Sequence, residues 1–270
     1  MPFADLNLAR RLEGAQTQWR ADCAQAQAAL RPEAGVAVER FAGGYAVYNP
    51  LGSPSSRAHA FGLGLGGPVG EEELELLEAF YRTRSVPAHV DLCPLADPTL
   101  TELLARRGYR LEGWTNVLVR PFLGGPAVAL PCGATVRQVA LPEAGLWAQV
   151  VARGFCEREV TQDEVGLGML VFSMPGTTCF LGLVDGQPAG GGAVALYQGV
   201  AILFGASTLV AFRRRGVQAA LLRARLALSA STGCDLATTL TQPGSGSQRN
   251  AERQGFQVAF TRALMTRAWA

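Results

Sequence analysis

The spacing of hydrophobic and polar residues predicts a chain that mixes helices and strands. Apolar residues at Val217, Leu221, Ala224 and Leu228 follow i, i+4, i+7 and i+11, which is typical of one helix face. Similar spacing predicts helices at 4–30, 71–84, 98–107, 142–156, 217–231 and 246–254, and a helix or loop over 161–174. Strands are predicted at 35–49, 58–64, 87–93, 109–120, 134–140, 178–184, 188–197, 200–210, 235–241 and 256–267. The fold class is therefore α+β, with mixed, mostly antiparallel sheets flanked by helices.

Two distant segments end alike. The stretches "LLARRGYRLEGWTNVLVR" (103–120) and "NAERQGFQVAFTRALMTR" (250–267) each run from a polar helix through Gly-aromatic into a strand. This self-similarity predicts two related units. The Pro/Gly-rich stretch "PFLGGPAVALPCG" lies between them, so we place the boundary near residue 126, with domains at 1–125 and 126–270.

Composition excludes several classes of protein. The net charge of +2 argues against nucleic acid as the main partner. No run of about 20 apolar residues exists, and the N-terminus has no apolar signal-peptide core, so we expect a cytoplasmic protein without membrane contact. The six cysteines form no C-x-x-C pair and there are two histidines, so no metal site is expected. We expect a monomer or a weak homodimer, because two fused units can replace a dimer.

Three arginines crowd the start of the helix at 217–231. A helix N-terminus carries partial positive charge and favours acids, so Arg213, Arg214 and Arg215 oppose that preference. A strand, a glycine-containing basic loop and a helix start together form an anion site, because first-turn N–H groups point at the ligand. A bound phosphate would make the three cations tolerable. The alternative is a solvated run of surface charge.

The stretch "STLVAFRRRGVQAALL" resembles the coenzyme-A-binding loop of the GCN5-related N-acetyltransferases, the GNAT superfamily. The family signature is Arg/Gln-x-x-Gly-x-Gly/Ala after a strand; Arg213 and Gly216 match it, whereas Gln218 departs from it. The element order of 134–267 and the stretch "PGSGSQRNAERQGF" also resemble the family. The resemblance implies a GNAT domain at 126–270 that binds acetyl-CoA. The implied cofactor-binding residues are Thr208, Leu209, Val210, Arg213, Arg214, Arg215, Gly216, Val217, Gln218, Ala219, Ser247 and Asn250.

The first unit has the same order of late elements, but Glu71, Glu72 and Glu73 occupy its helix start. These acids would repel a pyrophosphate. We therefore expect 1–125 to be a degenerate GNAT-like domain without a cofactor site.

Acetyl transfer needs a neutral amine and a route for its proton. The candidates for general base are Glu157, Glu159 and Asp163, between two helices that border the acceptor pocket in the family. A tyrosine on the late helix often acts as the family's general acid, and Ala251 stands at that position here.

The resemblance thus implies an N-acetyltransferase that moves acetyl from acetyl-CoA to a primary amine of a small-molecule or peptide acceptor. The missing tyrosine motivates an alternative, a non-catalytic acyl-CoA-binding or regulatory protein. A third possibility, an RNA-binding protein, is disfavoured by the small net charge and the few aromatic residues near 211–226.

Overall fold

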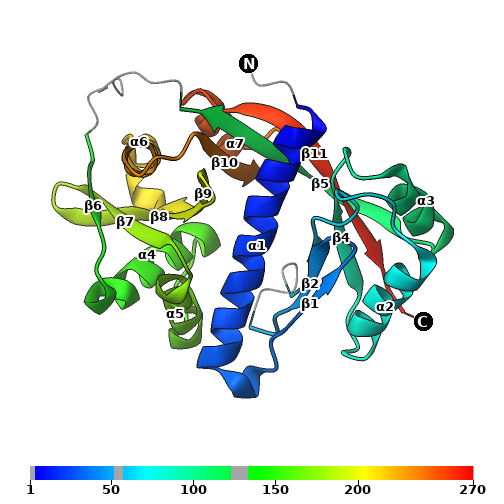
Figure 1. Cartoon of the computed structure of the whole chain (residues 1–270). Coiled ribbons are helices and arrows are strands. Elements are labelled where there is room, and N and C mark those ends of the chain that lie inside the picture. The colour runs from blue at the N-terminus through cyan, green and yellow to red at the C-terminus, as the bar shows by residue number, and fades with distance from the viewer. Residues whose placement is uncertain (1–3, 52–56, 123–132, 270) are drawn as a thin grey trace. The chain divides into compact units, whose positions relative to one another are not determined.

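The computed structural model describes residues 4–51, 57–122 and 133–269 (Figure 1). Contacts divide the chain into two compact units. One holds Met1–Val117, Thr241–Pro243 and Val258–Ala270, and the other holds Leu118–Leu240 and Gly244–Gln257. The boundary expected near residue 126 lies outside the described residues. This division differs from a cut at 126 in that the last strand belongs with the first unit, because Ala263–Arg267 pairs antiparallel with Ala88–Leu92.

The first unit follows the predicted succession of helices and strands. Its elements are α1 (Leu6–Leu30), a 3-10 turn (Pro32–Ala34), β1 (Ala37–Phe41), β2 (Gly44–Tyr48), β3 (Ala58–Phe61), α2 (Glu71–Arg82), β4 (Ala88–Leu92), α3 (Pro98–Arg106), β5 (Arg110–Pro121) up to Val117, and β11 (Gln257–Arg267) from Val258. The strand order is β1-β2-β3-β4-β11-β5. Asp97 caps α3 through its side chain, and Pro98 follows as the first helical residue.

One predicted strand is two strands. The stretch 35–49 forms a hairpin, in which β1 and β2 pair antiparallel from Ala37↔Tyr48 to Phe41↔Gly44. Ala42 and Gly43 form the turn with φ of 45° and 82°. Positive φ at both central residues matches the right-handed twist of the strands, and the sequence "FAGG" carries that signal.

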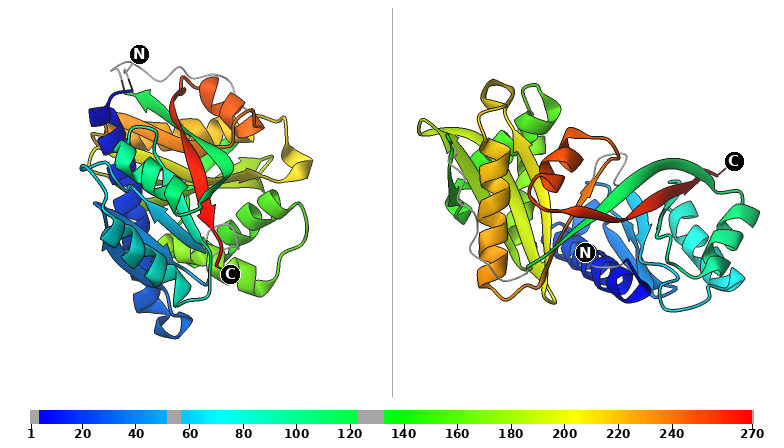
Figure 2. Two further views of the ribbon diagram at one scale, coloured as in Figure 1. Left: turned by 90° about the vertical axis from the view of Figure 1, so that its right-hand side faces the viewer. Right: turned by 90° about the horizontal axis from the view of Figure 1, so that it is seen from above.

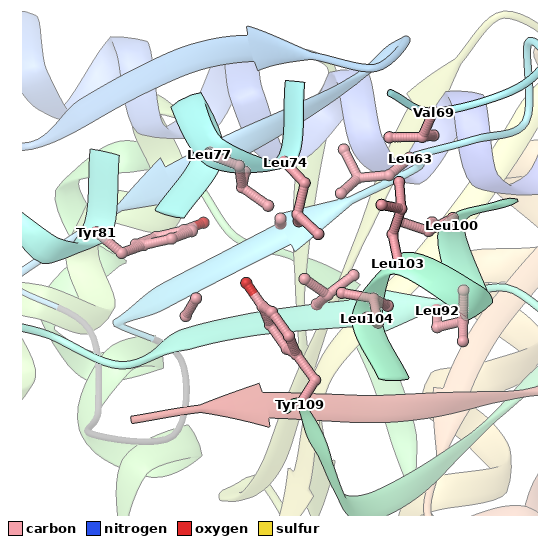
Figure 3. Packing of buried hydrophobic residues seen from close by; sticks show 14 of the residues in the cluster. Leu63, Val69, Leu74, Leu77, Tyr81, Leu92, Leu100, Leu103, Leu104 and Tyr109 are labelled. Carbon is pink, nitrogen blue, oxygen red and sulfur yellow. The ribbon is translucent and has the colours of Figure 1, made fainter. Parts of the chain in front are cut away.

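Alternate residues of the first sheet face different helices. Ala58, Ala60, Ala88 and Val90 pack against leucines of α2 and α3 (Figure 3). Phe61 and Val47 face the other way, toward Ala24 of α1. The period-2 alternation of a strand therefore places helices on both faces of this sheet.

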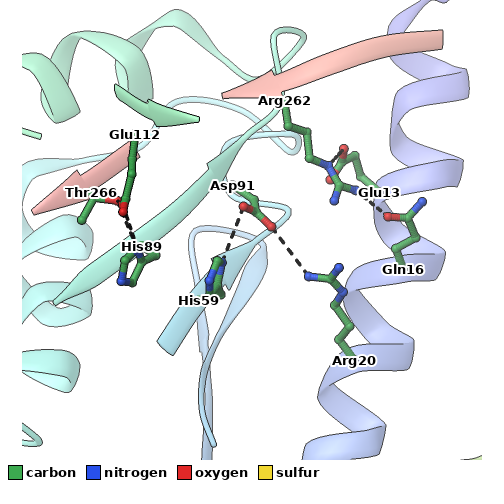
Figure 4. Close-up of polar contacts among 9 residues, drawn as sticks. All are labelled: Glu13, Gln16, Arg20, His59, His89, Asp91, Glu112, Arg262 and Thr266. Carbon is green, nitrogen blue, oxygen red and sulfur yellow. Dashed lines mark hydrogen bonds and ion pairs between the residues drawn. The ribbon is translucent and has the colours of Figure 1, made fainter. Parts of the chain in front are cut away.

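Buried charged residues tie α1 to its sheet (Figure 4). Arg262 of β11 lies 2.6 Å from Glu13 and donates to the Gln16 side chain at 2.7 Å. Arg20 lies 3.6 Å from Asp91 of β4. Glu13 and Arg262 are almost fully buried, so each charge needs the other to offset its loss of water.

The second unit holds a sheet in the order β10-β9-β8-β7-β6. Its elements are β6 (Thr135–Gln138), a 3-10 turn (Leu141–Glu143), α4 (Ala144–Cys156), α5 (Gln162–Met169), a 3-10 turn (Leu170–Ser173), β7 (Thr177–Val184), β8 (Gln187–Tyr197), β9 (Val200–Thr208), a 3-10 turn (Val210–Phe212), α6 (Val217–Ser231), β10 (Leu236–Thr241) and α7 (Gly246–Glu252). The stretch 161–174, predicted as a helix or loop, is α5 followed by a 3-10 turn.

Helices cover both faces of this sheet too (Figure 2). Phe180 and Val184 of β7 pack with Leu221 of α6, whereas Cys179 and Leu181 pack with Trp147 of α4. Of the helices in the described residues, none is both long and apolar enough to cross a membrane.

Candidate functional site

The end of β9 is freed from one neighbouring strand. β9 pairs in parallel with β10 only from Val200↔Leu236 to Leu203↔Thr239, although β9 continues to Thr208. Five residues, 204–208, therefore extend past the last pair. A strand end that runs past its neighbour is a place where an extended ligand can pair along the backbone, as in strand addition.

A bulge marks the same place on the other side of β9. Gly191 pairs with Ser207 and Ala193 with Phe204, so β9 carries one extra residue there. Gly205 lies at the bulge with φ of 59°, a conformation that favours glycine. Bulges bend a strand, and this one re-aims the end of β9 toward the loop that follows.

The arginine-rich loop then turns into α6 with a concave backbone. Arg214 and Gly216 have φ of 63° and 80°, both in the left-handed region, and α6 begins at Val217. The first-turn N–H groups of a helix have no acceptor within the helix. A left-handed residue before that turn aims successive N–H groups into a shared anion-binding hollow. The loop thus combines left-handed residues with a helix start, and the anion site there stays a prediction.

A cleft of about 680 Å³ lies over this loop, within the second unit. Of the twelve residues expected to bind cofactor, nine line it: Thr208, Arg213, Arg214, Gly216, Val217, Gln218, Ala219, Ser247 and Asn250. Leu209, Val210 and Arg215 do not line it. Leu209 instead donates its N–H to the Ala189 carbonyl at 2.9 Å, so its backbone continues the pairing with β8.

Two of the three arginines have carboxylate partners. Arg213 lies 2.6 Å from Glu157, and Arg215 lies 2.8 Å from Asp185. Arg214 forms no ion pair with any residue that the structure describes. Ion pairs with acidic residues that are distant in the sequence therefore partly offset the repulsion among the three arginines. The local sequence does not reveal these pairs.

Helix α7 brings two polar side chains to the cleft. Ser245 caps it by accepting from the Gln248 N–H at 3.2 Å, as the capping-box spacing predicts. Ser247 and Asn250 lie on the face that lines the cleft. Ala251 is buried in the core with Leu222 and Phe256, so the position of the missing tyrosine carries only a packed methyl group.

The three candidate bases lie at the α4–α5 connection and outside the cleft lining. Glu157 is the α4 C-cap, with φ of 56°, and pairs with Arg213. Glu159 lies 2.7 Å from Arg153 and is largely exposed. Asp163 is exposed in the first turn of α5. Nearby Glu164 pairs with Arg158, and this hydrogen bond lowers the pKa of the Glu164 carboxyl to about 2.

Two residues of α4 complete the cleft and were missed from the sequence. Gly154 has no room for a side chain, since a Cβ there would lie 2.4 Å from the Ser207 Oγ. Phe155 lines the cleft and is 60% exposed. The sequence offered one signal for this part of the cleft, which is the aromatic residue Phe155 in the last turn of the predicted helix at 142–156.

Comparison with known proteins gives the fold a name. No protein-family model and no curated protein sequence matches this chain. The structure is similar to a GCN5-related N-acetyltransferase from Kribbella flavida, with 18% identity, TM-score 0.64 and coverage of 93% of this chain and 96% of that one. It is also similar to a GCN5-related N-acetyltransferase from Sphaerobacter thermophilus, with 16% identity, TM-score 0.59 and coverage of 94% and 91%.

A third similar structure is a tandem GNAT protein from the clavulanic acid biosynthesis pathway. It is 14% identical, with TM-score 0.58 and coverage of 86% of this chain and 82% of that one. The chain has the GNAT fold. The resemblance stated from the sequence is confirmed at this level, as are the α+β class and the tandem arrangement of two GNAT-like units.

The two GNAT-like units differ at the place where the second has its cleft. In the first unit, β3 pairs with β4 through Phe61, the last residue of β3. In the described part of this unit, β3 has no end that runs past its neighbour as 204–208 runs past β10. Glu71, Glu72 and Glu73 fill the first turn of α2, where the helix dipole favours them.

Proposed function

We propose that this protein transfers an acetyl group from acetyl-CoA to a primary amine of a small-molecule or peptide acceptor, in the cytoplasm, as a monomer or weak homodimer. The observation that carries the proposal is the cleft over the Arg213–Ala219 loop. It joins a freed strand end, a helix N-terminus preceded by left-handed residues, and a lining without acids.

The described residues fit acetyl-CoA by charge and by shape. The lining holds Arg213, Arg214 and Arg253 and contains no Asp or Glu, which suits a pyrophosphate. The volume of about 680 Å³ is that of a ligand pocket rather than a crevice. N–H groups of Val217, Gln218 and Ala219 would hold the phosphates, and the end of β9 would pair with the pantetheine arm.

The bound thioester would supply the acetyl group, and the chain would orient it. Backbone N–H groups at the bulge of β9 would donate to the developing oxyanion. The proton of the amine would leave through one of the candidate bases Glu157, Glu159 and Asp163. Ser247 and Asn250 would hold the cofactor from α7.

One observation favours a second candidate, a non-catalytic acyl-CoA-binding or regulatory protein. Among the described residues that line the cleft there is no Tyr, His, Cys, Asp or Glu, so the described lining offers no side chain with ordinary acid–base chemistry for a leaving thiolate. Measuring free thiol during incubation with acetyl-CoA and a panel of primary amines separates the two candidates. Sustained, amine-dependent release supports the transferase.

The cofactor site itself is tested by calorimetry with acetyl-CoA. We expect one site per chain, because only the second unit combines the loop, the freed strand end and the cleft. Gly216→Glu should weaken binding at least about tenfold, roughly 1.4 kcal/mol, since it places a negative charge against the pyrophosphate. Gly216→Asn is the control, because asparagine tolerates the left-handed region and adds no charge. Unchanged affinity in a folded Gly216→Glu variant contradicts the proposal.

A further inference from the structure

Helix α1 contains a glycine that no neighbour requires. Gly14 lies mid-helix, and a Cβ built there would meet no atom within 4 Å. Glycine is among the least favourable residues in a helix interior. A glycine in a helix usually allows another segment of backbone to approach closely, and no described segment does so here. Gly14 instead leaves open space on the helix face that also carries Arg10, Thr17 and Gln18.

That space is a pocket of about 250 Å³ within the first unit. α1 forms one wall, the β1–β2 hairpin a second through Arg40, Gly43 and Tyr45, and the loop after β3 a third. The third wall is held tightly against α1. A Cβ on Gly62 of this loop would lie 2.8 Å from the Thr17 Oγ1, so the loop approaches as closely as glycine permits.

The described lining of the pocket carries positive charge. Arg10 and Arg40 belong to it, and no Asp or Glu is among its described residues. Other arginines of this unit have acids to pair with, such as Arg106 with Glu71 at 3.0 Å. Neither Arg10 nor Arg40 forms an ion pair with any described residue. Both arginines are exposed, so water screens their mutual repulsion, and both charges are free to attract an anion in the pocket.

The arginine on α1 is already oriented. The Arg10 Nε donates to the Leu65 carbonyl at 2.8 Å, which leaves its terminal amino groups free to bind oxygen atoms as a fork. Tyr45 is also fixed, since its hydroxyl donates to the Gln18 side chain at 2.9 Å. An oriented fork loses less entropy on binding than a free side chain.

We propose that this pocket of the first unit binds a small oxyanion, a carboxylate or a phosphate group, between Arg10 and Arg40 and over Gly14. The volume admits a small organic acid or a phosphate ester of similar size, and it is too small for a whole coenzyme A. The site shares no residue with the cleft of the second unit. The first unit, which is expected to lack a cofactor site, would thus bind a different ligand.

Calorimetric titration of the full-length protein at low salt tests the site, with inorganic phosphate and succinate as separate probes. Arg40→Gln should weaken binding of the preferred probe at least about tenfold, because one of two charges is lost. Gly14→Leu should abolish it by filling the pocket while keeping both arginines. The Tm of Gly14→Leu should not fall, because leucine is the better helix former.

Two further variants identify where any anion binds. Arg110→Gln removes one charge from an exposed site of the same unit outside the pocket, and it should leave binding unchanged. Arg214→Gln reports on the second-unit cleft: it should weaken any phosphate binding there and leave the binding that Arg40→Gln weakens. Phosphate binding that Arg214→Gln removes and Arg40→Gln leaves overturns the proposal, as does the absence of binding by both anions. The better probe shows whether the ligand is a carboxylate or a phosphate.

Discussion

The Arg213 guanidinium lies 2.6 Å from the Glu157 carboxylate, which joins the C-cap of α4 to the loop before α6. Both side chains are about half exposed, so the pair contributes little to folding. Its consequence is local. Glu157, a candidate general base, is paired with Arg213, which the family resemblance implies as a residue that binds the cofactor.

Replacing Glu157 separates these two roles. In Glu157→Gln we expect acetyl-CoA to bind a few-fold more tightly, because Arg213 is freed for the phosphates and a nearby negative charge is gone. The turnover number should change less than about tenfold, whereas loss of a general base typically costs 10²–10⁴. Glu159→Gln, which leaves Arg213 paired, is the control for the affinity change. A hundredfold loss of turnover at unchanged affinity would establish Glu157 as the base.

Gly154 lets α4 lie against the end of β9. Gly154→Ala should displace Ser207 and Thr208, since the new Cβ would lie 2.4 Å from the Ser207 Oγ and 3.2 Å from the Thr208 N. We expect a loss of about 1–3 kcal/mol in urea unfolding and weaker acetyl-CoA binding.

The matched control for Gly154→Ala is Gly145→Ala in the same helix. A Cβ at Gly145 meets its nearest atom at 3.9 Å, an ordinary contact, so this variant should unfold at the same or a higher urea concentration. Equal behaviour of the two variants would show that α4 does not constrain the cleft.

Arg225 of α6 donates hydrogen bonds to both strands at the bulge of β9. Its Nη1 donates to the Ala193 carbonyl at 3.2 Å and to the Phe204 carbonyl at 3.4 Å. It is 2% exposed, and burial lowers the pKa of its guanidinium to about 10. No acid in the described part of the chain forms an ion pair with it.

Arg225→Met removes one donor from each of these two carbonyls, and we expect a loss of about 1–3 kcal/mol in urea unfolding. The variant also no longer buries the Arg225 charge, and this gain offsets part of the loss of stability. Acetyl-CoA affinity should fall as well, because the bulge sets the end of β9. Arg223→Met, on the same helix and partly exposed, should change neither the urea midpoint nor the affinity. An unchanged acetyl-CoA affinity in Arg225→Met would show that the bulge does not influence cofactor binding.

Buried thiols make the fold sensitive to alkali. Burial raises the pKa of Cys23, Cys93 and Cys179 from 9.0 to about 12. Below pH 9 both states keep these protons. Between pH 9 and 12 the unfolded chain loses them while the folded chain keeps them, so stability falls as pH rises.

The loss is at most about 1.4 kcal/mol per pH unit for each thiol. Urea unfolding at pH 8 and 9.5 measures it, before most of the titration of Arg225, which acts with the opposite sign. Cys179→Ala should show a smaller fall than the parent protein, and exposed Cys156→Ala should show the same fall. Equal slopes in all three proteins would refute the assignment to Cys179.

Local patterns in the sequence were sufficient for most of the elements, although the stretch 35–49 is a hairpin of two strands and not one strand. The apolar stripe from Val217 to Leu228 defined α6, Asp97 and Ser245 defined helix starts, and the glycine and arginines before α6 indicated an anion site. These signals depend on residues within a few positions of each other, where periodicity, capping and turn chemistry act. The family resemblance used the same local stretch together with the order of the elements over 134–267 and the stretch "PGSGSQRNAERQGF".

Only the tertiary structure decided which distant residues complete or neutralise that loop. Glu157 and Asp185 reach Arg213 and Arg215 because α4 and the β7–β8 turn end beside the loop, and no spacing along the chain encodes such a meeting. The same holds for Arg225 beneath the bulge and for Gly14 beside Arg40. Periodicity assigns a residue to a face of a helix or strand, whereas packing between elements determines what that face meets.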